Sequence, residues 1–162
     1  DARGIETLAK EPDSYDEERP TSGSRIDYII SLGTLDTLND LPGALIHYRN
    51  ALDHGGILFA QIIGAGSLSA LRQIMFAADA DRPAAHIHPQ IDDRAATALL
   101  QRAGFSKQVV DSRRLTVRYS SLERMIADLR EQALTSVLAS PTPYVGKAGL
   151  IRARAAFEAM RD

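Results

Sequence analysis

IDYIISLGTLDTLNDLPGALIHYRNALDHGGILFA, residues 26–60, is the stretch that predicts the fold of this chain. It reads in order as an apolar strand, a polar loop, an amphipathic helix, a glycine turn and a second apolar strand. The first strand, residues 26–32, is almost continuously apolar, which is typical of a parallel strand covered on both faces. The stretch therefore predicts one βαβ unit of an α/β domain, with a crossover that is right-handed almost without exception.

The boundaries of this unit follow from capping and turn residues. We expect the helix to begin near Leu41, with Asp40 as the capping residue and Pro42 in the first turn. The run Asp53-His54-Gly55-Gly56 tolerates positive φ and is expected to end the helix. The second strand is then predicted over residues 57–63.

The loop Ser31–Asp36 directly follows the first strand. Ligands of parallel sheets bind just beyond the carboxyl ends of the strands, so a functional site is expected here first. Asp36 has two interpretations at this place. Its carboxylate can act as a base or orient a cationic acceptor, or it can simply cap a helix.

The rest of the chain predicts further helices and a pair of strands. Apolar residues at helical spacing predict helices over residues 68–81 with Ser67 as N-cap, 92–103 ending at Gly104, 121–132 and 147–161. Residues 105–111 and 115–119 are predicted to form an antiparallel hairpin. Residues 1–25 are rich in Asp, Glu, Pro and Ser and are expected to form a polar lead-in to a domain of residues 26–162.

Composition limits the class of protein. With 162 residues, 44% hydrophobic and 25% charged, the chain is long enough for one core and too short for two ordinary domains. A formal charge of −2 provides no basic field for nucleic acid or anionic lipid, so neither is expected as a partner. The absence of cysteine excludes disulfides and thiolate catalysis, and no stretch is long and apolar enough to predict a membrane span.

Several strings of the chain, taken as a set, resemble one protein family. They are IDYIIS, LNDLPGAL, GGILFAQIIG and SL..LR, followed by His88-Pro89, Asp92-Asp93-Arg94, the run 99–105, Val110-Asp111, the run 115–119 and the run 126–130. This set resembles class I S-adenosylmethionine-dependent methyltransferases. The branch it resembles contains the malonyl-carrier-protein methyltransferase of biotin synthesis and methyltransferase-like assembly factors of respiratory complex I.

The resemblance implies a Rossmann-like fold and S-adenosylmethionine as cofactor. It implies that Ser31, Leu32 and Gly33 contact the cofactor, and it places Asp16 where the family has an acid that contacts the adenine. A solvated charge run is the alternative interpretation of the segment around Asp16.

Two further residues are candidates for binding the substrate. The resemblance places His88 in the substrate cleft, with ordinary loop structure as the alternative. Arg118 is predicted either to bind an acidic substrate or to pair with Asp128. The pair His86-x-His88 lacks the spacing of a known metal site, so no metal is predicted.

One motif of the family is absent. Its glycine-rich G-x-G-x-G loop does not occur in this chain, and Gly64-Ala65-Gly66 follows the wrong strand. Because the chain also begins at Asp1 rather than Met, we expect it to represent the C-terminal half of the fold. That half would be a mixed sheet of two parallel strands and the hairpin, with flanking helices. The strand at 26–32 would then have an open edge, through which we expect a homo-oligomer to form.

Two functions of different class remain open. The first is methyl transfer to a small-molecule or protein acceptor, by a full-length form in the cytoplasm, or in the mitochondrial matrix of a eukaryote. The second is an assembly factor that keeps the fold without ordinary methyl transfer. The sequence Leu35-Asp36-Thr37 departs from the His or Gln followed by an aromatic residue that is usual in the family, which favours the second function.

Overall fold

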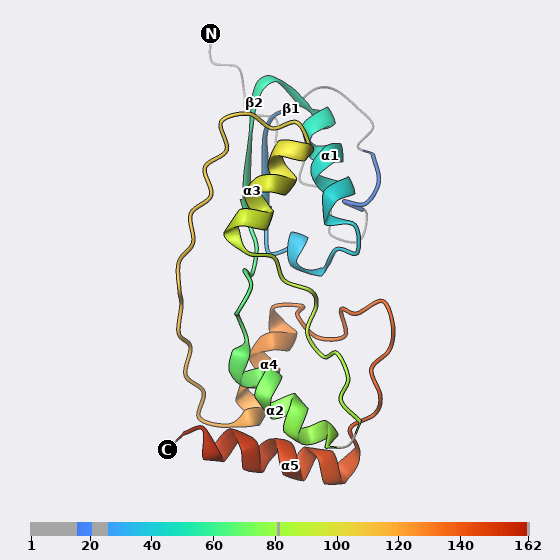
Figure 1. Cartoon of the computed structure of the whole chain (residues 1–162), viewed down its shortest axis with the longest axis vertical. Helices are drawn as coiled ribbons and strands as arrows, with labels where there is room; N and C mark the ends of the chain where they lie inside the picture. Colours follow the sequence, from blue (N-terminus) through green and yellow to red (C-terminus); the bar gives the residue numbers. More distant parts are fainter. Residues whose placement is uncertain (1–15, 21–25, 81, 162) are drawn as a thin grey trace.

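The computed structural model describes residues 16–20, 26–80 and 82–161. Its elements divide between two regions that follow one another along the long axis (Figure 1). One region contains the sheet with two helices, and the other contains three helices. The elements are β1 (Ile26–Leu32), the 3-10 turn η2 (Leu35–Thr37), α1 (Leu41–Ala51), β2 (Leu52–Gln61), α2 (Ser69–Asp79), α3 (Asp93–Arg102), α4 (Leu122–Glu131) and α5 (Gly146–Ala159).

The predicted βαβ unit is confirmed. β1 and β2 pair in parallel, with Tyr28 opposite Ile57 and Ile30 opposite Phe59. Asp40 caps α1 as expected, because its Oδ1 accepts a hydrogen bond from the Gly43 N–H at 2.9 Å. Both strands therefore end at the same side of the sheet, where η2 follows β1.

Residues 53–56 do not end α1 as predicted but lie within β2, which covers Leu52–Gln61 rather than the predicted 57–63. α1 ends at Ala51 and β2 begins directly at Leu52, which pairs with Ile26. The residues of the turn are accommodated as an irregularity in the pairing between Ile26 and Tyr28. Gly56 fits closely there, since a Cβ on it would lie 3.0 Å from the Ile26 carbonyl oxygen.

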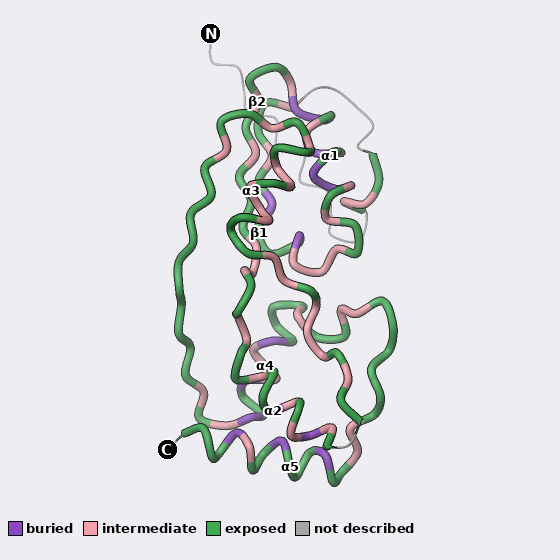
Figure 2. The backbone as a smooth tube through the Cα atoms, in the orientation of Figure 1, coloured by how far each residue is buried: buried purple, intermediate pink, exposed green. Residues whose placement is uncertain are grey.

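In the part of the chain that the structure describes, one face of the sheet is covered. α1 packs a cluster of buried residues against this face together with side chains from β1, β2 and α3, and the buried members are Leu35, Ala44, Leu45 and Tyr48. The other face is open, and Ile30 is 68% and Phe59 56% exposed. The expectation that β1 is covered on both faces is wrong for the described residues, because the helices that pack on the sheet lie on one side (Figures 1 and 2).

A second core joins α2, α4 and α5. Its buried side chains are Ile74, Ala78, Leu122, Met125, Leu129, Ala153 and Phe157. α2 and α5 approach closely at Gly149, where a Cβ would lie 2.4 Å from Val145 Cγ1 and 3.0 Å from the Ala78 carbonyl oxygen. Figure 2 shows these buried positions as a group separate from those along α1.

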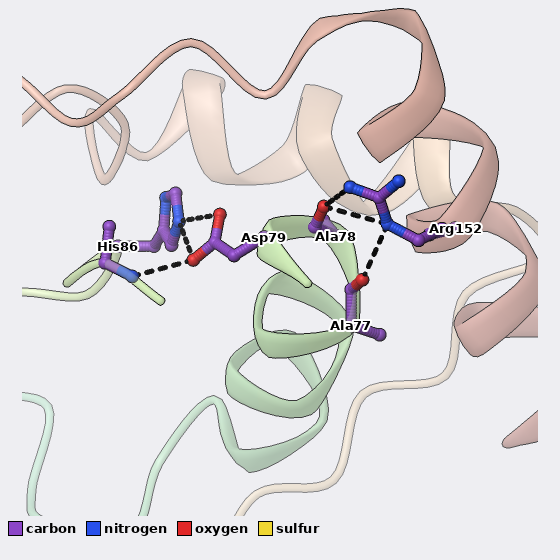
Figure 3. A network of polar contacts seen from close by, with 6 residues as sticks. Ala77, Ala78, Asp79, His86 and Arg152 are labelled. Carbon is purple, nitrogen blue, oxygen red and sulfur yellow. Dashed lines mark hydrogen bonds and ion pairs between the residues drawn. The ribbon is translucent and has the colours of Figure 1, made fainter. Parts of the chain in front are cut away.

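Polar side chains fix the end of α2. Arg152 of α5 donates from Nε to the carbonyl oxygens of Ala77 and Ala78, at 3.1 and 3.2 Å, and so satisfies the C-terminal carbonyls of α2 (Figure 3). Asp79 contacts His86 Nε2 at 2.9 Å through both carboxylate oxygens. Its Oδ2 also accepts from the Ala84 N–H at 2.8 Å. The connection after α2 is therefore attached to the helix.

The antiparallel hairpin predicted over 105–111 and 115–119 is not formed. These residues run as an extended connection from α3 to α4 without strand pairing (Figure 1, yellow to orange). Val109 is 90% and Leu115 81% exposed, so the segment has no apolar support. A lone hairpin is marginally stable in water, and this segment neither pairs with itself nor joins β2.

The helices otherwise lie close to their predicted positions, apart from one cap. Gly104 has φ +90° and ends α3 as expected, with the Phe105 N–H donating to the Leu100 carbonyl. Ser67 does not cap α2, because the helix begins one residue later, at Ser69, and Leu68 at the N-cap position has φ 56°. Among the described residues, no helix has the length and hydrophobicity needed to cross a membrane.

We predict that Gly149→Ala destabilises the protein, although alanine is the better helix former. The added Cβ overlaps Val145 and presses on the backbone of α2, and overpacking of this kind costs about 1–3 kcal/mol. Chemical denaturation measures the change in the free energy of unfolding. Ala155→Gly, at an exposed position of α5, is the control and is expected to cost about 1 kcal/mol by helix propensity alone. A stabilised Gly149→Ala variant would contradict the close contact.

Candidate functional site

A cavity of about 500 Å³ lies beyond the carboxyl ends of β1 and β2. Four segments line it, namely the loop and first helical turn after β1, the residues that follow β2, the connection between α2 and α3, and the segment 138–143 before α5. Its size is that of a small-molecule pocket. Its place agrees with the rule that predicts ligand sites at this end of a parallel sheet.

Asp36 lies in η2 and lines this cavity. Its Oδ1 accepts a hydrogen bond from the Ile63 N–H, which connects the loop after β1 to the chain leaving β2. Partial burial raises the pKa of the Asp36 carboxyl, while the Ile63 N–H and the nearby His88 act in the opposite direction. Asp36 does not cap α1, since Asp40 has that role.

His88 lines the cavity from the connection between α2 and α3. Its Nδ1 is 3.2 Å from the Pro89 carbonyl oxygen, an acceptor only, so Nδ1 carries the proton. In the neutral ring, Nε2 is then an acceptor. His86 lies two residues before His88 and is held by Asp79, which limits how far His88 can move.

Gln90 adds a buried polar atom to the same wall. Its side-chain Oε1 is buried and accepts no hydrogen bond within the part of the chain that the structure describes. Buried carbonyl oxygens are nearly always satisfied. Gln90 is also among the residues that line the cavity.

The loop Ser31–Gly33 lies at the end of β1 but does not line the cavity. Ser31 is buried, and its hydroxyl is 2.8 Å from Thr34 Oγ1. Gly33 has φ +76°, a Cβ on it would lie 4.0 Å from Asp36 Oδ2, and Leu32 is exposed. These residues present mainly backbone to any ligand above the strand.

The acidic lead-in contacts the start of α1 through Glu18, whereas Asp16 was the residue expected to contact the adenine of the cofactor. Asp16 is exposed and engaged locally, with Arg19 at 2.9 Å and the Glu18 N–H at 3.0 Å. Glu18 instead reaches the unit, accepting from the N–H groups of Asn39 and Asp40 at 2.6 and 3.0 Å. The segment is therefore attached where α1 begins, although Asp16 does not line the cavity.

Arg118 does not lie at this site. It is exposed on the extended connection before α4 and is not among the residues around the cavity. The predicted pair with Asp128 is not formed, because Asp128 accepts from the Tyr119 hydroxyl and from Gln132 Nε2. In the described ranges there is no group of three or more residues suited to hold a metal ion.

The fold and the cavity define an α/β protein with a site at the carboxyl end of a βαβ unit. Comparison with characterised proteins identifies the family. The chain is 30% identical over 144 residues to a malonyl-[acyl-carrier protein] O-methyltransferase of Xylella fastidiosa, covering 88% of this chain and 48% of that protein. It is 30% identical over 119 residues to the mitochondrial arginine-hydroxylase NDUFAF5 of Danio rerio, covering 71% and 37%.

A second NDUFAF5, from Dictyostelium discoideum, is 23% identical over 82% of this chain. The chain belongs to the branch of the S-adenosylmethionine-dependent methyltransferase-like family that contains these proteins. It spans between about a third and a half of the length of these relatives. No family model matches it.

Sequence reasoning found two residues of the cavity and missed the rest. Asp36 and His88, far apart in the chain, do meet there. The segment 138–143 and Gln90 were missed. The Pro141-Thr142-Pro143 run predicts an extended segment, but nothing in the sequence indicates that it reaches the sheet.

We predict that Asp36→Asn changes how stability depends on pH. Because the carboxyl pKa is raised in the folded state, the folded state binds more protons between the ordinary pKa and the folded pKa. The contribution of Asp36 protonation to the stability of the folded state is complete below the ordinary carboxyl pKa. This contribution is lost as pH rises through the pKa of Asp36 in the folded state. Asn does not titrate and can still accept from the Ile63 N–H. The stability of the variant relative to the parent should therefore increase as pH rises through that range.

Urea denaturation from pH 3 to pH 7 measures this difference. Asp111→Asn, at an exposed position outside the cavity, is the control for removing a carboxylate. A difference between Asp36→Asn and the parent that stays constant with pH, or that changes in the opposite direction, would contradict the raised pKa.

Proposed function

We propose that this chain forms the acceptor side of an S-adenosylmethionine-dependent methyltransferase. The observation that carries the proposal is the meeting of Asp36, His88 and Gln90 in one cavity beyond the carboxyl ends of β1 and β2. Homology to malonyl-[acyl-carrier protein] O-methyltransferases supports it. The acceptor is a small molecule or a side chain of another protein.

The residues of this chain fit only part of a site for S-adenosylmethionine. Gly33 has φ +76° at the end of β1, and the backbone of Ser31, Leu32 and Gly33 would contact one side of S-adenosylmethionine. Ser31 is already paired with Thr34, and the sequence contains no G-x-G-x-G loop for the methionine end. We propose that this chain is the C-terminal half of the fold and that the rest of the cofactor site lies in a preceding half.

The residues of this chain orient the acceptor and remove its proton. The cofactor supplies an electrophilic methyl group on a sulfonium sulfur. The acceptor would direct a lone pair at that methyl group, and the residues of this chain would hold the acceptor in position. The proton lost by the acceptor goes to His88 Nε2 or to Asp36. Burial makes Asp36 a stronger base than an exposed carboxylate.

An assembly-factor-like role without ordinary methyl transfer is the second candidate. The observation that favours it is Asp36 itself, because a carboxylate stands where methyltransferase relatives carry His or Gln. Several relatives at similar identity are named arginine-hydroxylases rather than methyltransferases. The cytoplasm, or the mitochondrial matrix of a eukaryote, is the proposed location for either function.

Calorimetric titration with S-adenosylmethionine and S-adenosylhomocysteine tests the first function. We expect no measurable binding to this chain alone, because the glycine loop is not in its sequence. A longer natural polypeptide that includes this chain and such a loop should bind both. The matched control is the longer polypeptide with its loop glycines replaced. Failure of the intact longer form to bind either compound would contradict the methyltransferase function.

We also propose that the chain associates with a second copy through the edge of β1. Among the described residues β1 pairs only with β2, which leaves its other edge unpaired, and the apolar side chains Tyr28, Ile30 and Leu32 are exposed on the uncovered face next to that edge. We expect a dimer or larger assembly in light scattering at micromolar concentration. Ile30→Lys should weaken it, and Phe76→Lys, which is equally exposed on α2, should not. A monomeric parent protein would contradict the proposal.

A further inference from the structure

Hydrogen bonds join three of the four segments around the cavity. Asp36, in the loop after β1, accepts from the Ile63 N–H of the chain that leaves β2. The Ala65 N–H of that same chain donates to the Ile91 carbonyl oxygen at 2.8 Å, at the end of the connection between α2 and α3. These three segments therefore hold one another in place and form a fixed part of the site.

The fourth segment lacks such bonds. Residues 135–144, which we call the strap, connect α4 to α5 and contribute residues 138–143 to the cavity (Figure 1, orange). Within the described part of the chain the strap makes no hydrogen bond, and residues 139–144 are exposed. A segment with little burial and no hydrogen bonds to its surroundings opens at low free-energy cost.

The strap is anchored at its two ends. Leu134 before it and Val145 after it pack against the core that joins α2, α4 and α5. Left-handed backbone lies close to each anchor, at Ser136 with φ 60° and at Gly146 with φ 68°. This conformation is strained for serine, and backbone strain of this kind is typical of segments that switch between conformations. Ser136 and Gly146 therefore have the positions of two hinges.

The middle of the strap is stiff, and its contacts with the cavity are largely apolar. Pro141 and Pro143 have a fixed φ and no N–H that needs a partner. Leu138 is half-buried and lines the cavity together with both prolines. A stiff centre between two hinges moves as one unit, and burial of Leu138 favours the position in which the strap lies against the cavity.

We propose that the strap is a lid, which opens and closes over the cavity as one unit about Ser136 and Gly146. The position in the structure, with Leu138 and the prolines lining the cavity, is the closed one. The open position admits the acceptor, and closure keeps water away from it. The inference rests on the proposed function for the role of the cavity as an acceptor site, whereas the motion of the strap requires no cofactor.

Because the chain contains no cysteine, a single introduced thiol can report access to the cavity. Ala84→Cys places the thiol at a half-buried position that lines the cavity, and Ala139→Cys places it at an exposed position of the strap. Labelling with a neutral pyridyl disulfide, normalised to the rate in denaturant, should be at least about tenfold slower at position 84. Equal normalised rates at the two positions would overturn the proposal.

Hinge variants should change this rate in opposite directions. In the Ala84→Cys background, Gly146→Ala strains the closed position and should accelerate labelling, while Ser136→Gly relieves strain there and should slow it, each by at least about threefold. Gly55→Ala is the matched control, because it places a Cβ at φ +84° at the far end of β2 from the cavity. It should leave labelling unchanged. An unchanged rate in either hinge variant, or changes in the same direction, would overturn the proposal.

Urea separates opening of the strap from unfolding of the whole chain. Local opening exposes little surface, so labelling at position 84 should change little at urea concentrations well below the unfolding midpoint. Labelling that follows the global unfolding curve would overturn the lid. Amide spectra establish that each variant is folded. Because no cofactor is present, these outcomes are independent of S-adenosylmethionine binding by the longer polypeptide.

Discussion

Parallel pairing of β1 with β2 is the constraint on which the site depends. Two parallel strands point their carboxyl ends the same way, so the chain that leaves β1 and the chain that leaves β2 must emerge side by side. The Asp36 carboxylate then reaches the Ile63 N–H. Without that pairing the loop after β1 would have no fixed wall opposite it, and Asp36 would be an ordinary surface acid.

The second wall depends on contacts much farther apart in sequence. His88 and Gln90 are positioned because Asp79 holds His86 and the Ala84 N–H, and the end of α2 is itself satisfied by Arg152 of α5. The helical region therefore supports the cavity rather than forming a separate unit. Retaining a half-buried carboxylate costs stability at neutral pH, since burial disfavours its charged form. Such a cost is common at functional sites.

Prediction from sequence succeeded where the signal is local. The βαβ unit, the Asp40 cap and the Gly104 stop each depend on a few neighbouring residues, and each is confirmed. Prediction from sequence failed where a segment needs a packing partner from elsewhere in the chain. Residues 105–119 have the composition of strands, yet Val109 and Leu115 remain exposed because no strand edge or apolar surface receives them. Asp16 was expected at the site for its family position and Arg118 as a possible partner of an acidic substrate, and the structure places neither in the cavity.

The sequence by itself determined the parallel unit at residues 26–60 and the loop that carries Asp36, because apolar periodicity and capping residues act over a few positions along the chain. It also carried the family resemblance that homology confirms. Only the tertiary structure decided which face of the sheet is covered and that Asp36, His88, Gln90 and the segment 138–143 share one cavity. Those facts depend on contacts between residues that are distant in sequence, which no local pattern encodes.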